Sequence, residues 1–341
     1  MKLELITTME RFESLQAEWN SLLPDNATNE IFLTWEWQST WWQCYQPGDL
    51  WVVAARDTDH NNRLVGLAPW FIEQPARVIR TIGCVEVTDY LDVLAVPGSR
   101  EEFYLALVDF LVEHATDFSC LDLCNIPAGT PTLDLLPRLL TERGFAVQVK
   151  HEDVCPFIPL PSDFETYLDQ LDKKQRHELR RKLRRAEAGD EAKLDWYIVG
   201  PEHDLNAEMD RFLDLMESSH PDKAKFLGES YHKAFFKTVM PRLAACGWLQ
   251  LSFLTVKDTA VATYLNFDYN NRILVYNSGL LPSSYSHLSA GIILLIYNIQ
   301  YAISKGRSEF DFLQGNEEYK YRMGGQDRSV LMLEATLQSL S

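Results

Sequence analysis

The sequence lacks an excess of basic residues. Its 341 residues include 32 Lys and Arg against 49 Asp and Glu, so the formal net charge at pH 7 is −17. Proteins that bind nucleic acids in general need a basic surface that neutralises phosphate groups. The composition therefore argues against general nucleic-acid binding.

Several motifs that mark common active sites are also missing. There is no GxxxxGK[ST] loop for nucleotide hydrolysis, no GxGxxG turn for a dinucleotide and no GxSxG turn for a nucleophilic serine. The eight histidines show no HExxH spacing, and of the six cysteines only Cys120 and Cys124 stand close together. We therefore predict a protein with no metal site and with reduced thiols.

Long apolar segments are absent as well. The N-terminus, MKLELITTMERF, lacks the apolar core of a signal peptide. The longest apolar helix expected, over 289–303, is too short to span a bilayer and contains Asn298 and Gln300. These features predict a cytoplasmic protein that does not insert into a membrane.

What the sequence does contain is enough apolar material for two cores. Apolar residues make up 46% and aromatic residues 12% of a chain that is long for a single core. A proline-rich stretch at 155–161, CPFIPLP, is typical of an edge strand or an inter-domain crossing. We therefore predict two domains, over 1–155 and 156–341.

Apolar periodicity and turn residues predict the elements of each half. In the first half we expect helices over 9–23, 35–45, 100–115 and 132–142, and strands over 50–56, 63–72, 78–84, 90–96, 119–124 and 145–150. In the second half we expect helices over 163–187, 204–218, 229–245 and 289–305, and strands over 194–199, 248–256, 260–269, 272–280, 309–313 and 329–337. Each half contains a strand pair, a further strand, a long helix and a returning strand. This order predicts an α/β protein with two similar domains, each a mixed sheet flanked by helices.

The charge is unevenly distributed along the chain. Residues 173–185, KKQRHELRRKLRR, contain eight Lys and Arg against one Glu, a local charge of +7. A basic helix on an acidic protein indicates either a site for an anionic ligand or a solvated helix face. The sequence leaves both interpretations open.

The loop at 286–291, SHLSAG, precedes an apolar helix. A helix N-terminus carries unpaired N–H groups and a positive dipole end, which together bind phosphate groups. Ser289 is a candidate cap, and Gly291 permits close approach by a ligand. The loop by itself therefore fits either an ordinary capped helix, which is common, or a phosphate site that includes His287, Leu288, Ser289 and Gly291. His287 is equally suited to contact a ligand or to cap the loop.

Polar residues also follow two strands that flank this helix. The strand before it ends in Tyr276, Asn277, Ser278 and Gly279, which suits a ligand crossing point. The strand after it places Asp311 on the face opposite Phe310 and Phe312. The chain then supplies further polar side chains: Gln314, Asn316, Tyr319, Lys320 and Arg322.

One stretch between helices has an open interpretation. In SSHPDKAKFLG, His220 fits either an acceptor-binding loop or a plain inter-helix turn, and we favour the turn.

The tryptophan-rich helix at 35–45 fits core packing better than a sugar platform.

The order YNSG, HLSAG, helix and FDFLQGNEEYKYRMGG, preceded by KKQRHELRRKLRR, resembles the GNAT-type acetyltransferase family found in cellulose and exopolysaccharide gene clusters. That family is similar to the Fem-type peptidoglycan aminoacyltransferases, which are built from two GNAT-like domains. The resemblance is strongest over 160–325, and over 1–150 it is carried by the tryptophan-rich helix and the strand GLAPWFI. It implies two tandem GNAT-like domains and transfer of an acyl group from an acyl-CoA to an amine.

The resemblance also implies roles for the polar residues. Acetyl-CoA, or another acyl-CoA, would lie against Asn277, Ser278 and loop 286–291, with no metal involved. Asp311 would act as base or orient the amine, and Tyr319 or Tyr276 would protonate the thiolate. Gln314, Asn316, Lys320 and Arg322 would bind the substrate, a small-molecule amine such as an amino sugar or a cell-envelope precursor.

Two other functions remain open from the sequence. One is a Fem-like aminoacyltransferase that uses aminoacyl-tRNA, for which the basic helix at 173–185 would bind phosphates. The other is a non-catalytic GNAT-like binding module, since only Ser289-Ala290-Gly291 stands where the family has a longer phosphate-binding signature. Oligomeric state is not predicted.

Overall fold

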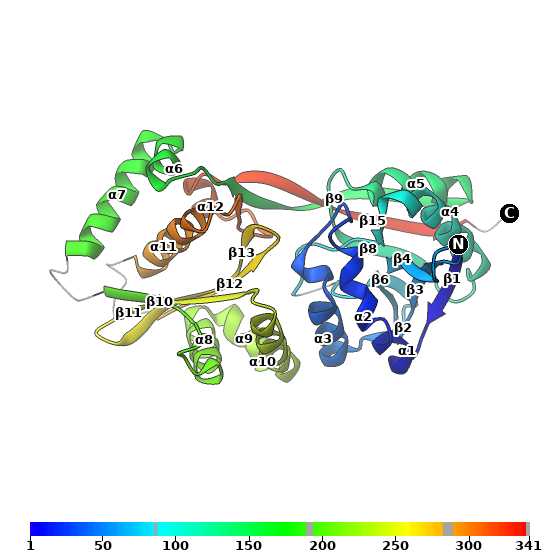
Figure 1. The fold of residues 1–341 in the computed structure, drawn as a ribbon, viewed down its shortest axis with the longest axis horizontal. Coiled ribbons are helices and arrows are strands. Elements are labelled where there is room, and N and C mark those ends of the chain that lie inside the picture. The colour runs from blue at the N-terminus through cyan, green and yellow to red at the C-terminus, as the bar shows by residue number, and fades with distance from the viewer. Residues whose placement is uncertain (85–86, 189–193, 282–288, 339–341) are drawn as a thin grey trace. The chain divides into compact units, whose positions relative to one another are not determined.

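The chain folds into two compact units, described by a computed structural model for residues 1–84, 87–188, 194–281 and 289–338 (Figure 1). Unit 1 comprises Met1–Val154 and Arg328–Ser341, and unit 2 comprises Cys155–Asp327. The sequence assigned the C-terminal segment to the second domain. The structure assigns it to unit 1 because β15 (Gln326–Leu337) pairs antiparallel with β8 (Cys120–Pro127).

Unit 1 contains two sheets and five α-helices within its described residues. The strands, with β8 and β15 above, are β1 (Lys2–Ile6), β2 (Gly48–Leu50), β3 (Val52–Asp57), β4 (Arg63–Ala68), β5 (Trp70–Glu73), β6 (Val78–Thr81), β7 (Leu94–Ala95) and the first part of β9 (Phe145–Pro159). The helices are α1 (Met9–Glu13), α2 (Gln16–Trp19), α3 (Trp35–Tyr45), α4 (Arg100–Glu113) and α5 (Pro131–Glu142). One sheet has the order β1-β3-β4-β7, and the other contains β15-β8-β6-β5-β2.

The core of unit 1 is formed by its helices and strands, and it confirms the core packing predicted for the tryptophan-rich helix. Phe103 and Leu107 of α4 and Leu136 of α5 are fully buried against strand residues such as Val65 and Leu121. Trp37 of α3 is also fully buried. The α3 helix has the bounds that the sequence predicted.

The predicted helix over 9–23 is wrong in one respect, because it is broken. It forms α1, α2 and a 3-10 turn at Asn20–Leu22. The Ser14 hydroxyl donates a hydrogen bond to the Arg11 carbonyl at 2.7 Å. A serine that bonds to the preceding turn competes with the helical ladder and favours a break there.

The prediction that all thiols are reduced is also wrong. Cys84 and Cys124 form a disulfide with their Cα atoms 6.1 Å apart. Cys124 lies in β8, and Cys84 follows β6, which pairs in parallel with β8. The two cysteines are separated by 40 residues in the sequence, so only strand pairing reveals that they meet.

Unit 2 is a single mixed sheet between two layers of helices. Its strands are β10 (Leu194–Ile198), β11 (Leu249–Val256), β12 (Thr259–Tyr269), β13 (Arg272–Leu280), β14 (Glu309–Asp311) and the last part of β9, in the order β10-β11-β12-β13-β14-β9. Its helices are α6 (Phe164–Gln170), α7 (Lys173–Ala188), α8 (Leu205–Ser219), α9 (Pro221–Gly228), α10 (Ser230–Ala245), α11 (Ala290–Ser304) and α12 (Glu318–Arg322). Figure 1 shows α11 on one face of the sheet and α8 to α10 on the other.

Unit 2 corrects two predictions about its helices. The predicted helix over 163–187 is two helices, because Leu171 is extended (ψ 152°) and Asp172 accepts the backbone N–H groups of Lys174 and Gln175. The stretch after His220, predicted as a turn, is helix α9. The His220 ring accepts the Asp222 N–H at 3.2 Å, and Pro221 occupies the first helical position.

Candidate functional site

The site is built where two neighbouring strands of unit 2 separate. Strands β13 and β14 pair in parallel over Arg272–Leu274 and Glu309–Asp311, and in the described residues their pairing ends there. The β12–β13 register also shifts, from Leu265 opposite Asn277 to Asn266 opposite Val275. This shift is a β-bulge with Tyr276 as the extra residue. In the described residues, the last third of β13 therefore has no paired strand on the side of β14, and we call this side its open edge.

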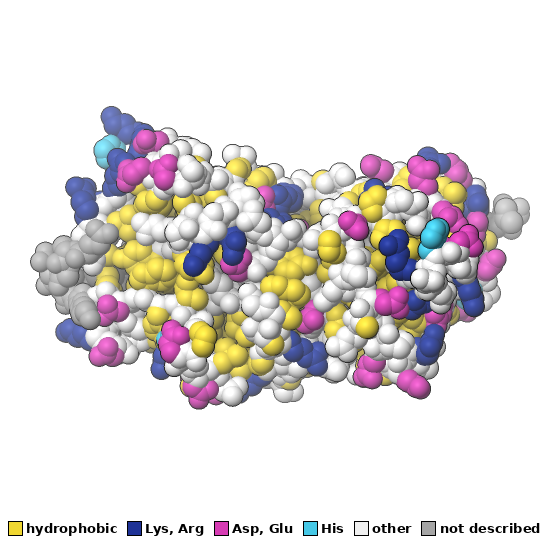
Figure 2. All heavy atoms as spheres, in the orientation of Figure 1, with side chains coloured by type: hydrophobic (Ala, Val, Ile, Leu, Met, Phe, Trp, Pro, Cys, Tyr) yellow, Lys and Arg dark blue, Asp and Glu magenta, His cyan; other side chains and the backbone are white. Residues whose placement is uncertain are grey.

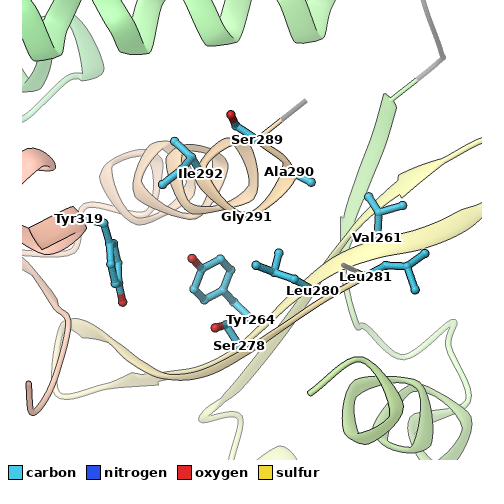
Figure 3. Close-up of a pocket in the computed structure, with 10 residues that line it drawn as sticks. All are labelled: Val261, Tyr264, Ser278, Leu280, Leu281, Ser289, Ala290, Gly291, Ile292 and Tyr319. Atoms are coloured by element: carbon cyan, nitrogen blue, oxygen red, sulfur yellow. The ribbon is translucent and has the colours of Figure 1, made fainter. Parts of the chain in front are cut away.

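A cavity of about 460 Å³ occupies this space (Figure 3). Its lining comes from β12, β13, the start of α11 and α12: Val261, Tyr264, Ser278, Leu280, Leu281, Ser289, Ala290, Gly291, Ile292 and Tyr319. Most of these side chains are apolar, and the polar ones are hydroxyls. A concave, mainly apolar pocket with a few polar groups is the usual form of a small-molecule site.

The first residues of α11 form one end of the cavity. Ser289 occupies the N-cap position in a left-handed conformation (φ 55°), but its side chain makes no capping hydrogen bond, contrary to the prediction. Instead its hydroxyl accepts a hydrogen bond from the Lys182 ammonium of α7 at 2.7 Å. A helix N-terminus and an ammonium group thus meet at one point, which favours an anionic ligand. The predicted contacts of His287 and Leu288 lie outside the described residues.

The end of β13 contributes Ser278 but not its two predecessors. Asn277 is not a lining residue, and its Oδ1 atom accepts the Ser278 N–H at 2.9 Å. The Tyr276 ring lies 6.2 Å from Phe236 of α10 and 5.1 Å from Phe267, on the sheet face that α10 covers. Because Tyr276 is the extra residue of the bulge, strand alternation does not bring it among the described residues that line the cavity, and its catalytic role stays a prediction.

Asp311 and Lys320 hold the turn that follows β14. Asp311 is fully buried, and its Oδ1 atom accepts the Leu313 N–H at 2.8 Å. Lys320 is 2% exposed, and its ammonium donates to the carbonyls of Leu313, Gln314 and Gly315 at 2.8–3.1 Å. Both side chains are therefore engaged by the protein itself and do not line the cavity.

This turn places Glu317 beside the site. The Lys320 ammonium lies 2.9 Å from the Glu317 carboxylate, whose side chain is 57% exposed. Gly315 has a positive φ of 110°, and a Cβ atom there would lie 2.7 Å from Glu317 Oε2. Glycine at 315 therefore serves both the turn and the position of this carboxylate.

Tyr319 is the predicted catalytic residue that the structure does bring to the cavity. Its ring and that of Tyr264 both project into it (Figure 3). Burial, and next the Glu317 carboxylate, raise the pKa of Tyr319 above its usual value. Burial, with Tyr319 as the second cause, also raises the pKa of Tyr264. Both hydroxyls are therefore protonated near neutral pH.

Lys223 of α9 lies beside this site, although no sequence motif indicated a role for it. Its ammonium donates to the Ser278 carbonyl at 2.5 Å and lies 3.4 Å from the Ser278 hydroxyl. Burial lowers the pKa of Lys223 to about 8, and the Glu317 carboxylate opposes this shift. The signal for its helix was present in the sequence, since proline after a capping residue marks a helix start.

The remaining predicted substrate residues do not line this cavity. Asn316 is exposed and Gln314 is half-buried. Arg322 pairs with Glu318 at 2.5 Å and borders a second cavity between α7 and α12, together with Lys174 and Arg181. Figure 2 shows dark-blue basic side chains gathered over the α7 end of unit 2. These basic groups form a separate surface from the apolar cavity.

Two further findings concern the described ranges only. Every helix in them is too short or too polar to span a bilayer. They also contain no group of three or more His, Cys, Asp and Glu side chains placed to hold a metal ion.

Comparison with protein families agrees with this geometry. Residues 173–321 match the family model described as an acetyltransferase (GNAT) domain. This segment of unit 2 is therefore similar to a GNAT domain. The matched segment includes α7, α9, β12, β13, α11 and Tyr319, and so every described element around the cavity. The match indicates acyl transfer as the class of reaction.

Solved structures show the fold over the whole chain. FemX is 11% identical, with 97% of each chain covered and a TM-score of 0.61. A conserved protein of unknown function from Bacteroides thetaiotaomicron is 11% identical, with 98% of this chain and 100% of that chain covered and a TM-score of 0.63. L-PGS from Bacillus licheniformis is 12% identical, with 98% and 94% covered and a TM-score of 0.54.

At these identities the likeness concerns the fold alone. It confirms the predicted fold class, a mixed α/β protein with a tandem GNAT-like fold. No curated protein matches the sequence.

Proposed function

We propose that the protein is an N-acyltransferase that moves an acyl group from an acyl-CoA, acetyl-CoA in the simplest case, to an amine of a small molecule. The observation that carries this proposal is the cavity at the open edge of β13, which ends at the N-terminus of α11 inside a GNAT domain. An extended donor with an anionic end fits an apolar cavity that leads to a helix N-terminus.

The residues present fit a coenzyme A ester. The ester would supply an activated thioester carbonyl. The N–H groups at the start of α11 and the Lys182 ammonium would hold its diphosphate, because both attract negative charge. Gly291 leaves room beside Leu280, since a Cβ atom there would lie 3.0 Å from Leu280 Cδ2. The apolar lining of the cavity excludes water from the reacting carbonyl.

Tyr319 is our candidate proton donor to the leaving thiolate. Its hydroxyl is protonated at neutral pH because burial and Glu317 raise its pKa, and its ring lines the cavity. Asp311 acts in this proposal as a positioning residue, because it holds the turn that leads to Glu317 and Tyr319. Lys320 supports the same turn from its other side.

For the acceptor we propose an amino sugar or another amine of a cell-envelope or exopolysaccharide precursor. The Glu317 carboxylate, which is largely exposed beside the site, would attract the ammonium group of such a molecule. A specific observation also favours a second candidate, a Fem-like reaction with aminoacyl-tRNA. The basic surface of α7, with Arg181 and Arg322 around its own cavity, is suited to phosphate groups.

Calorimetry of the full chain with acetyl-CoA tests the donor. We expect binding with micromolar affinity and one site per chain. A Tyr319→Phe variant should bind equally well but transfer acetyl groups to glucosamine about 100-fold more slowly, the usual effect of losing a general acid. Tyr321→Phe is the matched control, since the Tyr321 hydroxyl bonds to Asp327 at 2.8 Å and lies outside the cavity lining.

Absence of heat with acetyl-CoA would refute the proposal. In that case, binding of aminoacyl-tRNA measured in the same way would support the Fem-like reaction, and failure of both would leave a non-catalytic module. An unchanged rate in Tyr319→Phe would remove only the role of the tyrosine.

A further inference from the structure

Lys223 places an ammonium group against the wall of a cavity whose lining residues, within the described part of the chain, are uncharged. None of the ten residues drawn around the cavity in Figure 3 carries a charge. Lys223 reaches the wall from α9, with its nitrogen 2.5 Å from the carbonyl oxygen of Ser278. Ser278 lies on the open edge of β13, where the proposed thioester would pass. The amine nitrogen of Lys223 therefore lies beside the open edge of β13, 3.4 Å from the hydroxyl of Ser278, which lines the cavity.

The surroundings of Lys223 favour its neutral form to an unusual degree. Burial lowers the pKa of Lys223 to about 8, and of the nearby charges Glu317 acts in the opposite direction. Two other acidic groups on the packed elements are paired with cationic or histidine side chains. Asp222 of α9 lies 3.4 Å from His220, and Glu217 of α8 lies 2.8 Å from Lys233 of α10.

We propose that Lys223 is the general base of this site and removes a proton from the ammonium group of the acceptor. This inference rests on the acyl transfer proposed above. A neutral ε-amine keeps N–H groups for the Ser278 carbonyl and has a lone pair for the incoming proton. General bases work best when they are partly deprotonated near the working pH. A lysine in this environment is partly deprotonated at that pH.

The proton transfers balance with the residues at hand. The acceptor R–NH3⁺ gives one proton to neutral Lys223 and becomes a free amine. Its lone pair forms the new C–N bond, and the C–S bond breaks with its electron pair on sulfur. Tyr319 donates its proton to the thiolate. After the C–N bond has formed, the acceptor nitrogen loses a second proton, and the Tyr319 oxygen takes it up. The products are an amide, a thiol and protonated Lys223, which returns its proton to water.

A purely structural role for Lys223 would be to join α9 to β13 through the Ser278 carbonyl. Two substitutions separate this role from catalysis. In Lys223→Arg a donor remains available to the carbonyl, but a guanidinium stays protonated at any usable pH. Lys223→Met has neither function. Lys225→Met, two residues further along α9 and exposed, is the matched control.

The first measurement is kcat/KM of the full chain for acetyl-CoA and glucosamine between pH 6 and 9.5. For the wild type we expect kcat/KM to rise with pH and level off with a midpoint near 8, because deprotonated Lys223 is the active form. Both Lys223 variants should lose about 100-fold in rate together with this midpoint. Their affinity for acetyl-CoA should stay within twofold, and Lys225→Met should match the wild type.

The second measurement needs no acceptor. Trace labelling with acetic anhydride, followed by peptide mass spectrometry, reports how readily each lysine reacts as the pH rises. Lys223 should reach its plateau near pH 9, and saturating acetyl-CoA should protect it but not Lys225.

The possible results separate the two proposals. If the wild type does not bind acetyl-CoA, the proposed function is wrong and this inference falls with it. If it binds but both Lys223 variants keep the rate and the pH midpoint, only the role of Lys223 is wrong. The same holds if the labelling of Lys223 still rises beyond pH 10, or if acetyl-CoA does not protect it.

Discussion

Two parallel strand pairs, one in each unit, have the same local topology but different surroundings. In unit 1, β6 pairs with β8 through Val78 with Cys120 and Ile79 with Leu121, and α4 precedes β8 in the chain. In unit 2, β13 pairs with β14 over three residues on each strand, and α11 precedes β14. The two pairs differ in the chain segment that comes after the first strand of each.

In unit 1 this segment fills the space beyond the strands. The Cys84–Cys124 disulfide ties it to β8. The Asn125 side chain donates to the Thr88 carbonyl at 2.7 Å, and the Asn125 carbonyl accepts the Leu91 N–H at 2.9 Å. Leu91 is fully buried.

In unit 2 the same position is the cavity beside Ser278 and Tyr319. One architecture therefore supports either a filled core or a ligand site, depending on the segment attached to the end of a single strand. We expect acyl-CoA to bind in unit 2 alone.

The largest expected effect comes from filling the cavity of unit 2. In Gly291→Leu the new Cβ atom would lie 3.0 Å from Leu280 Cδ2, and the side chain would occupy space that the donor needs. We expect acetyl-CoA affinity to fall at least about 100-fold, as measured by calorimetry, because the leucine side chain and the donor would compete for the same volume. The melting temperature should not fall, since leucine has a higher helix propensity than glycine.

Gly98→Leu in unit 1 is the control for this change. No heavy atom lies within 4 Å of a Cβ atom built at Gly98, so the substitution should leave acetyl-CoA binding unchanged. Normal binding in Gly291→Leu would place the donor outside the cavity.

The second-largest effect comes from removing the disulfide in unit 1. Replacing both Cys84 and Cys124 by serine removes a link across 40 residues, which should reduce the free energy of unfolding by roughly 2–4 kcal/mol in urea titrations. We expect acetyl-CoA still to bind at one site per chain, because buried side chains and hydrogen bonds also fill the space. Cys246→Ser, at an exposed cysteine outside the disulfide, is the control. A second binding site in the double variant would show that the disulfide alone closes unit 1.

The smallest effect tests the end of the cavity in unit 2 that would bind the anionic part of the donor. Lys182→Met removes the ammonium that bonds to Ser289 at the start of α11. We expect acetyl-CoA affinity to fall about two- to fivefold, the usual effect of a partly exposed ion pair, and to fall less at high salt. Arg184→Met, on an exposed part of the same helix, should change little. Equal losses in both variants would indicate a general charge effect and not a contact at Ser289.

The sequence by itself determined the elements whose signals are local. The α3 helix, the three strands β11 to β13, and α11 to within one residue at each end follow from apolar periodicity and from turn residues. The motif around Tyr319 also carried the resemblance to the family whose model matches residues 173–321. Such signals lie within about ten residues of one another, so a reading along the chain detects them.

Only the tertiary structure decided which polar residues reach the cavity. The bulge in β13 turns Tyr276 away, and burial directs Lys320 to the carbonyls of its own turn. Lys223 meets Ser278 from 55 residues away in the sequence. A side chain's role depends on the partners that strand register and helix packing bring to it, and these partners are distant in the sequence. For this reason the resemblance of the C-terminal motifs could predict a GNAT-like fold, whereas the arrangement of the site required the tertiary structure.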